Sequence, residues 1–111
     1  MFNVNLMISE KSKFKVGNVE FDAMTQSLSC DQGTLYLRQK LNDVLYLMVI
    51  NQSKPVSRHE LIEKVWNGNI YTGTKAVTHS VCELRKAFQN LGADDIEIKT
   101  LPKRGYILKV C

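Results

Sequence analysis

Basic side chains surround a short turn near the end of the chain. Lys103 and Arg104 lie at the centre of a pattern typical of a β-hairpin, Ile96 to Val110, and the segment from Lys99 to Lys109 contains four cations and no acid. Cations at an exposed turn attract phosphate groups, because their charges lie close together and no acid offsets them. Plain solvation of a charged turn is the alternative, and the absence of acids favours an anionic ligand.

A helical pattern, Thr74 to Asn90, precedes this hairpin and divides into an apolar stripe and a polar face. At about 100° per residue, the apolar side chains fall within about 60° of one another. The stripe consists of Val77, Val81, Leu84 and Phe88. The polar side carries Lys75, Thr78, His79, Cys82 and Lys86, with Arg85 on the flank.

Lysines bind phosphates, and short polar side chains allow a helix to settle deep in the major groove and contact base edges. The helix and the hairpin together therefore predict binding to duplex DNA. The hairpin is expected on the neighbouring backbone or in the minor groove.

The part of the chain that must position these two segments begins with predicted β-strands. In the first 37 residues, apolar side chains alternate with mostly polar ones, which is the period of a β-strand. The alternation runs through Phe2, Val4, Leu6, Ile8, Phe14, Val16, Val19 and Phe21. Gly17-Asn18 is a two-residue hairpin signal. A second turn, Asp31-Gln32-Gly33, is expected to bring Leu28 and Cys30 opposite Leu35 and Leu37.

Two helices are predicted after this sheet. The first begins at Arg38 and ends before the loop from Asn51 to Pro55. Its apolar face consists of Leu41, Val44, Leu45 and Met48. Ser57, followed three residues later by Glu60, forms a capping box, so a second helix of about ten residues is expected to begin there and to end at Gly68.

The third helix is the one that carries the polar face. We expect Gly68, Asn69 and Gly73 to form a loop before it, Thr74 to be its N-cap and Gly92 to lie near its end. The sheet (1–37), the three helices (38–92) and the hairpin or wing (96–110) then make one α+β domain of 111 residues, a winged helix-turn-helix.

Charge, cysteines and hydrophobicity narrow the class of protein. The net charge of +4 arises entirely after residue 51, where ten basic residues oppose six acidic ones, and this favours an anionic partner. The three cysteines are an odd number and lie far apart in the sequence, at Cys30, Cys82 and Cys111. This pattern indicates a reduced, intracellular protein. Met1 to Lys11 lacks the features of a signal peptide, and the longest apolar run, Val44 to Ile50, is far too short to span a bilayer. We therefore expect a cytoplasmic domain, and no cofactor.

Several residues also have simpler interpretations. His79 and Cys82 have no further Cys or His near them, so a metal site is not expected. His59 is expected to be solvated, and Trp66 to be a core residue, a phosphate contact, or both.

Two other classes of protein are an enzyme and a protein-interaction module. Asp94-Asp95 does not converge on a pocket and there is no Gly-rich phosphate loop, so catalysis is not expected. A protein-interaction module that uses the N-terminal sheet or the first helix is the remaining class. Its apolar interface should hardly respond to ionic strength, whereas DNA binding should weaken steeply.

Short motifs along the chain occur in an order that is specific to one family. They are Val16-Gly17 with Phe21-Asp22, Val56-Ser57-Arg58 with Glu60-Leu61, Val65-Trp66, Val77-Thr78-His79-Ser80-Val81 with Leu84-Arg85-Lys86, and Thr100-Leu101-Pro102-Lys103-Arg104-Gly105-Tyr106. With these motifs, residues 14–110 resemble the C-terminal output domain of OmpR/PhoB-type regulators. The Pro-Lys-Arg-Gly-Tyr segment of the hairpin is more similar to the DNA-binding domains of the CadC/ToxR-like activators.

The resemblance implies a four-stranded N-terminal sheet, three helices and a wing, with the third helix in the major groove of promoter DNA. It also implies a bacterial transcription activator that pairs on DNA and is tethered to the inner membrane by a helix beyond Cys111, with RNA polymerase as a second candidate partner. A soluble response-regulator output domain is the alternative. Cys82 and Glu83 replace arginines that are frequent in response regulators. Glu83 either accepts a hydrogen bond from cytosine N4 or repels phosphates. The base preference of response regulators is therefore not transferred to this chain.

The helix, the hairpin and the matched motifs together give one set of expected DNA contacts. They are Arg58, Trp66, Thr74, Lys75, Thr78, His79, Cys82, Arg85, Lys86, Thr100, Lys103 and Arg104.

Overall fold

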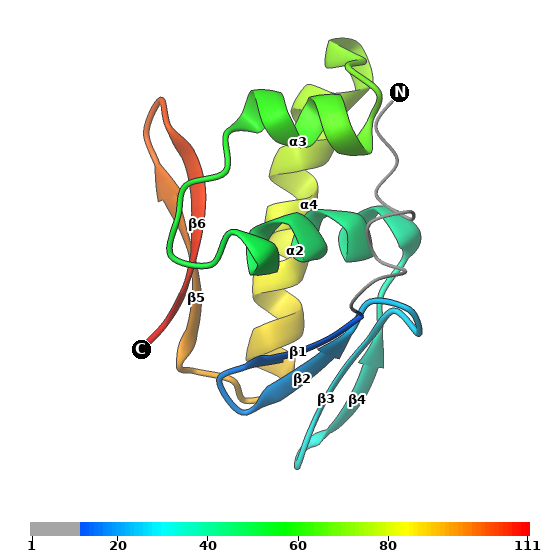
Figure 1. Ribbon diagram of the computed structural model, residues 1–111, viewed down its shortest axis with the longest axis vertical. Helices are drawn as coiled ribbons and strands as arrows, with labels where there is room; N and C mark the ends of the chain where they lie inside the picture. The colour runs from blue at the N-terminus through cyan, green and yellow to red at the C-terminus, as the bar shows by residue number, and fades with distance from the viewer. Residues whose placement is uncertain (1–11) are drawn as a thin grey trace.

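A four-stranded antiparallel sheet forms one end of the molecule in the computed structural model, which describes residues 12–111 (Figure 1). Its strands follow one another in chain order: β1 Lys13–Val16, β2 Val19–Asp22, β3 Ser27–Cys30 and β4 Gly33–Tyr36. Gly17-Asn18 closes the first hairpin, as predicted, and Gly17 has a φ of +59°. The alternation noted at Phe2, Val4, Leu6 and Ile8 lies outside the described residues.

The turn between β3 and β4 is shorter than the sequence suggested. Leu28 lies opposite Leu35, as predicted, but Gly33 already pairs with Cys30, so the turn consists of Asp31-Gln32 alone. Gly33 has a φ of +140°, which glycine adopts without steric cost. This freedom allows β4 to begin one residue earlier than a three-residue turn would permit.

Within residues 12–111, three helices and a hairpin complete the fold. They are α2 Gln39–Ile50, α3 Arg58–Val65, α4 Ile70–Asn90, β5 Ile96–Leu101 and β6 Gly105–Val110. Together with the N-terminal sheet, they confirm the predicted α+β architecture of sheet, three helices and wing. The N-terminal sheet and the tip of the wing lie at opposite ends of the molecule (Figure 1).

The centre of the fold is α2, which packs against α3, α4 and β6. Every residue from Leu41 to Val49 is buried, so this helix is covered on all sides and not only along the predicted apolar face. Asn42 Nδ2 donates to the carbonyl of Ala23 at 3.1 Å and so connects α2 to the segment after β2. Burial raises the pKa of the Asp43 carboxyl, against the lowering effect of the hydrogen bond from Gln39. The apolar side chains of α2 are thus part of the core of this domain.

The predicted cap at the start of α3 is confirmed. Ser57 Oγ accepts a hydrogen bond from the backbone N–H of Glu60 at 3.0 Å. The helix ends at Trp66, because Asn67 and Gly68 both have positive φ angles and the N–H of Gly68 returns to the carbonyl of Ile62. At eight residues, α3 is somewhat shorter than the predicted ten.

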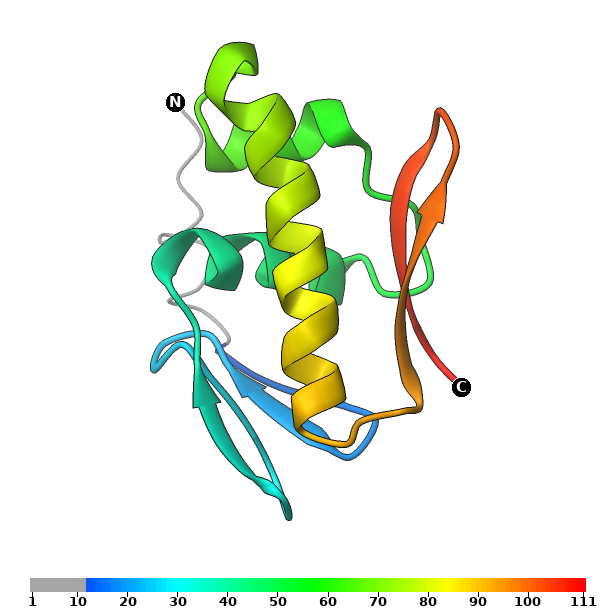
Figure 2. The same cartoon turned by 180° about the vertical axis from the view of Figure 1, so that it is seen from behind.

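The prediction that Thr74 is the N-cap of the third helix is wrong. The cap is Asn69, whose Oδ1 accepts from the N–H groups of Tyr71 and Thr72 at 3.1 and 3.2 Å. Thr74 lies one turn inside the helix and donates its hydroxyl to the carbonyl of Ile70 at 2.7 Å. The first turn has low intrinsic helix propensity, which explains why the sequence pattern suggested a loop. The resulting α4 runs through most of the length of the molecule (Figure 2).

An isolated backbone bridge joins the wing to the loop between α2 and α3. Val56, in the loop between α2 and α3, forms both backbone hydrogen bonds of an antiparallel bridge with Tyr106, at 2.7 and 2.9 Å. Gly105 sits so close to this loop that an added Cβ would lie 2.1 Å from the carbonyl oxygen of Val56. Its φ of +110° is a backbone conformation that glycine adopts readily, and the close approach gives a second reason for glycine here.

We predict that Gly73→Ala destabilises the domain, although alanine usually favours a helix by about 1 kcal/mol over glycine. An added Cβ would lie 2.8 Å from Cγ2 of Ile62, a branched side chain that has little freedom to move aside. Overpacking of this kind costs about 1 to 3 kcal/mol. A thermal melt should therefore show a lower Tm than the wild type.

The control is a double-mutant cycle with Ile62→Ala, which removes the clashing atoms. On that background, Gly73→Ala should be neutral or stabilising. A single Gly73→Ala variant that melts at or above the wild-type temperature would contradict the close α3–α4 contact.

Candidate nucleic-acid interface

The polar face predicted for the third helix is exposed on α4. The apolar stripe of Val77, Val81, Leu84 and Phe88 is at most 3% exposed and faces the core. The exposed positions include Lys75, Thr78, His79, Cys82 and Lys86. The helical facing deduced from the sequence is thus confirmed.

A shallow groove runs along the first half of this face. Its lining consists of Arg58, Thr74, Lys75, Ala76, Thr78, His79 and Cys82, six of them from α4. The side chains at its centre are short, and so the helix backbone can approach a flat or convex ligand closely. Cys82 is a free thiol on this surface.

Arg58 lies at the edge of the groove and binds three groups of the protein itself. Its Nη1 donates to Oγ1 of Thr78 at 3.1 Å and to the hydroxyl of Tyr106 at 2.6 Å. Its Nη2 donates to the backbone carbonyl of Thr74 at 2.6 Å. Arg58 therefore joins the start of α3 to α4 and to β6. Sequence spacing gave no signal for this role.

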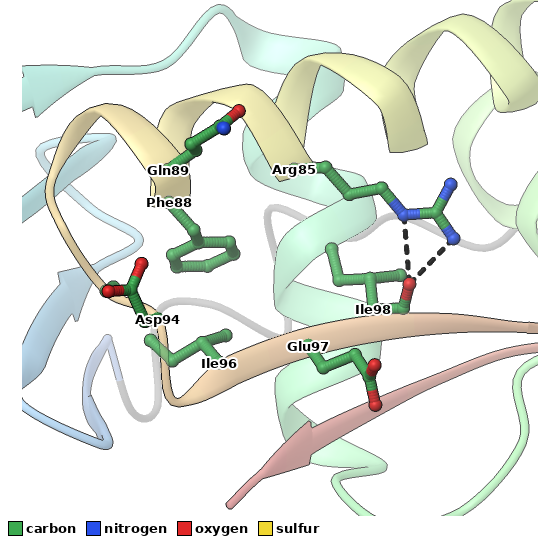
Figure 3. A pocket seen from close by; sticks show the side chains of 8 residues that line it. Arg85, Phe88, Gln89, Asp94, Ile96, Glu97 and Ile98 are labelled. Atoms are coloured by element: carbon green, nitrogen blue, oxygen red, sulfur yellow. Dashed lines mark hydrogen bonds between the residues drawn. The ribbon is translucent and has the colours of Figure 1, made fainter.

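Arg85 forms a second connection between α4 and the wing (Figure 3). Its Nε and Nη2 both donate to the carbonyl of Ile98, at 2.9 and 2.6 Å, and Nη2 also donates to Oγ1 of Thr100 at 2.9 Å. Arg85 is among the DNA contacts expected from the sequence. The partner is instead the backbone of β5, and Thr100 belongs to the same contact.

Trp66 packs against the core, as one of its two interpretations predicted, while its contact with phosphate stays a prediction. Its side chain is half-buried and packs against the core cluster. It also lines a second groove beside the first, together with Arg38, Lys40 and His79. Its ring therefore supports the fold and reaches the same side of the molecule as the polar face of α4.

Arg38 was not expected at this site. It donates through Nη2 to both carboxylate oxygens of Glu83, at 2.6 and 2.7 Å, and Glu83 also contacts Nε2 of His79. The spacing of His79 and Glu83, four residues apart on a helix, could have indicated their contact. The contact with Arg38 spans 45 residues of sequence and has no local signal.

The wing tip presents two exposed cations on a tight turn. The N–H of Arg104 bonds to the carbonyl of Leu101 at 2.9 Å, and between them lie Pro102 and Lys103, whose φ is +64°. This combination corresponds to a type II turn, which usually has glycine at the position of Lys103. Left-handed backbone is unfavourable for a lysine by roughly 1 to 2 kcal/mol, so the turn is maintained by the rest of the hairpin.

The cations at the wing tip and on α4 differ from the arginines described above in having no protein partner. Within residues 12–111, no side-chain hydrogen bond or ion pair involves Lys75, Lys86, Lys103 or Arg104. Four permanent charges on this side of the molecule are therefore available to an anionic ligand.

Among the described residues, no group of three or more His, Cys, Asp or Glu side chains is placed to hold a metal ion. The helices within residues 12–111 include none whose length and apolar character would allow it to cross a membrane.

Comparison with known proteins gives a consistent result. The family model described as transcriptional regulatory protein, C terminal, matches residues 32–108. The transcriptional activator CadC of Escherichia coli is 40% identical over 77 residues, which cover 68% of this chain and 15% of CadC. The transcriptional regulatory protein VxrB of Vibrio cholerae is 28% identical over 90% of this chain and 39% of its own length.

A solved structure extends the similarity to three dimensions. The DNA-binding domain of E. coli CadC superimposes with a TM-score of 0.75 and 35% identity, covering 87% of this chain and 91% of that domain. The chain thus spans only a small part of the CadC and VxrB proteins but nearly all of the CadC DNA-binding domain. It belongs to the family of transcriptional regulatory protein C-terminal domains, the OmpR/PhoB-type winged-helix DNA-binding domains of transcription regulators.

Proposed function

We propose that this domain binds promoter DNA sequence-specifically, with α4 in the major groove and the wing tip on the adjacent backbone or in the minor groove. The observation that carries the proposal is the pair of free cations on α4, Lys75 and Lys86, on the same exposed face as short polar side chains. Phosphate contacts fix the register of a protein on DNA, and short polar groups then meet base edges. Catalysis has no part in this proposal.

The expected contact residues divide into two groups under this proposal. Those that face the ligand are Trp66, Thr74, Lys75, Thr78, His79, Cys82, Lys86, Lys103 and Arg104. Arg58, Arg85 and Thr100 act mainly by holding α4 and the wing at a fixed distance, because their hydrogen bonds run to protein groups. Both groups are needed if helix and wing are to contact one duplex together.

We further propose that the intact protein is a bacterial transcription activator that pairs on DNA, with RNA polymerase as a second partner. The identity to the activator CadC supports this role. The similarity of the Pro-Lys-Arg-Gly-Tyr wing to CadC/ToxR-like regulators supports a tether to the inner membrane, which would leave this domain in the cytoplasm. An apolar segment of about 20 residues beyond Cys111 in the intact protein is the expected result. Fusion to a receiver domain instead would favour the soluble response regulator.

Affinity for duplex DNA should fall steeply as salt rises, because the free cations displace counterions from phosphates. We expect a slope of about −0.9 in log affinity against log salt for each neutralised phosphate, with roughly four to six phosphates contacted. Fluorescence anisotropy of a labelled promoter fragment at several salt concentrations measures the slope. Tight binding that does not change with salt would instead indicate an apolar protein-interaction module.

Replacing both Lys103 and Arg104 by alanine should weaken binding to specific and random duplexes by a similar factor. The salt slope should flatten by about 1 for each cation lost, since phosphate contacts carry no sequence information. The fold should be retained, because both side chains are exposed and alanine is no larger. Anisotropy and a thermal melt on the same variant measure the two effects.

The matched control is Lys13→Ala with Lys15→Ala, which removes the same charge from exposed positions on β1, at the opposite end of the molecule from the wing tip (Figure 1). This variant should bind nearly as the wild type does. Equal losses in the two double variants would mean that net charge, and not the wing, accounts for the effect.

A further inference from the structure

Three side chains form a continuous chain of contacts from the start of α2 to the polar face of α4. Arg38, the N-cap residue of α2, binds both oxygens of Glu83, and Oε1 of Glu83 is 2.5 Å from Nε2 of His79. The Glu83 side chain is only 27% exposed, whereas those of Arg38 and His79 are each 73% exposed. The carboxylate thus lies between two partners, and His79 projects from the surface.

Glu83 determines which nitrogen of a neutral His79 carries the hydrogen. An ionised carboxylate only accepts hydrogen bonds, so Nε2 must be the donor and Nδ1 keeps a free lone pair. Within residues 12–111, Nδ1 has no hydrogen-bond partner. His79 borders both grooves on this side of the molecule. A neutral His79 therefore presents a hydrogen-bond acceptor on the exposed face of α4.

Arg38 makes this arrangement compatible with DNA. A lone carboxylate on a DNA-binding face would repel phosphates, but the guanidinium of Arg38 offsets its charge and fixes its position. The two oxygens of Glu83 are already engaged by Arg38 and His79, so Glu83 is poorly placed to accept from cytosine itself. Of the two roles that the sequence left open for Glu83, acceptance from cytosine N4 is the one for which His79 is better placed.

We propose that His79 recognises an exocyclic amino group in the major groove, N6 of adenine or N4 of cytosine, by accepting a hydrogen bond at Nδ1. Guanine and thymine present a keto oxygen at the corresponding place, and a lone pair would then face a lone pair. Glu83 and Arg38 are positioning residues that hold His79 in this form. The inference rests on the proposed function, because it requires α4 to lie in the major groove.

The test is the selection of binding sites from a pool of randomised duplexes by the wild-type domain and by variants. The wild type should enrich adenine or cytosine at the position that His79 contacts. His79→Lys offers only donors there, so it should change the preference at that same position to guanine or thymine. Glu83→Ala should remove the preference at this position and leave the others. Exchange of an amino base for a keto base should lower wild-type affinity by about 5- to 150-fold.

Lys86→Ala is the matched control, because it removes a cation from the same face without changing the His79 contacts. It should weaken binding to all sequences by a similar factor and leave every base preference in place.

Heteronuclear NMR of the imidazole nitrogens tests the positioning role in the absence of DNA. Neutral His79 should be the Nε2–H form in the wild type and a mixture of both forms in Glu83→Ala. Arg38→Ala should lower the Nε2–H fraction, and Arg38→Lys should restore part of it.

Two results would overturn the inference while leaving the proposed function intact. One is an enriched site whose base preferences are the same in the wild type, His79→Lys and Glu83→Ala. The other is a free wild-type protein in which His79 carries its hydrogen on Nδ1. Enrichment of no sequence, together with no salt-dependent binding, would overturn the proposed function itself.

Discussion

The hydrogen bonds of Arg58 and Arg85 set the geometry on which a two-part DNA contact depends. Arg58 connects α4 to Tyr106 on β6, and Arg85 connects α4 to the backbone of β5. A helix in one groove and a hairpin on the neighbouring backbone must stay at a fixed separation, since DNA offers a fixed spacing of phosphates. Gly105 adds to this constraint, because only glycine allows β6 to approach the loop at Val56 so closely.

Arginine and lysine have different roles on this side of the molecule. Three of the four arginines, Arg38, Arg58 and Arg85, bind protein groups through several hydrogen bonds each, as the planar guanidinium allows. Among the described residues, Lys75 and Lys86 have no side-chain partner, and a flexible ammonium suits phosphates whose positions vary slightly. Under the proposed function, arginine would therefore position the DNA-contacting elements, while the general attraction to DNA would depend mainly on lysine.

The sequence was sufficient to predict elements whose signals are local. Helical periodicity identified the buried stripe and the exposed face of α4, and Ser57 with Glu60 identified the start of α3. Thr74 was wrongly expected to be an N-cap, because the first turn of α4 is stabilised by Asn69 and by the packing of Gly73 on Ile62. The contacts of Arg38, Arg58 and Arg85 could not be predicted, because they join residues between 13 and 48 positions apart.

We expect the exposed face of α4 and the wing tip to contact one duplex together. The most direct measurement is a backbone-amide NMR titration of the domain with a duplex that it selects. We predict shifts along the exposed face of α4, around Lys75, Thr78 and His79, and at Lys103 and Arg104, with little change in the sheet of β1 to β4. Shifts concentrated in that sheet, with the α4 face unchanged, would contradict it.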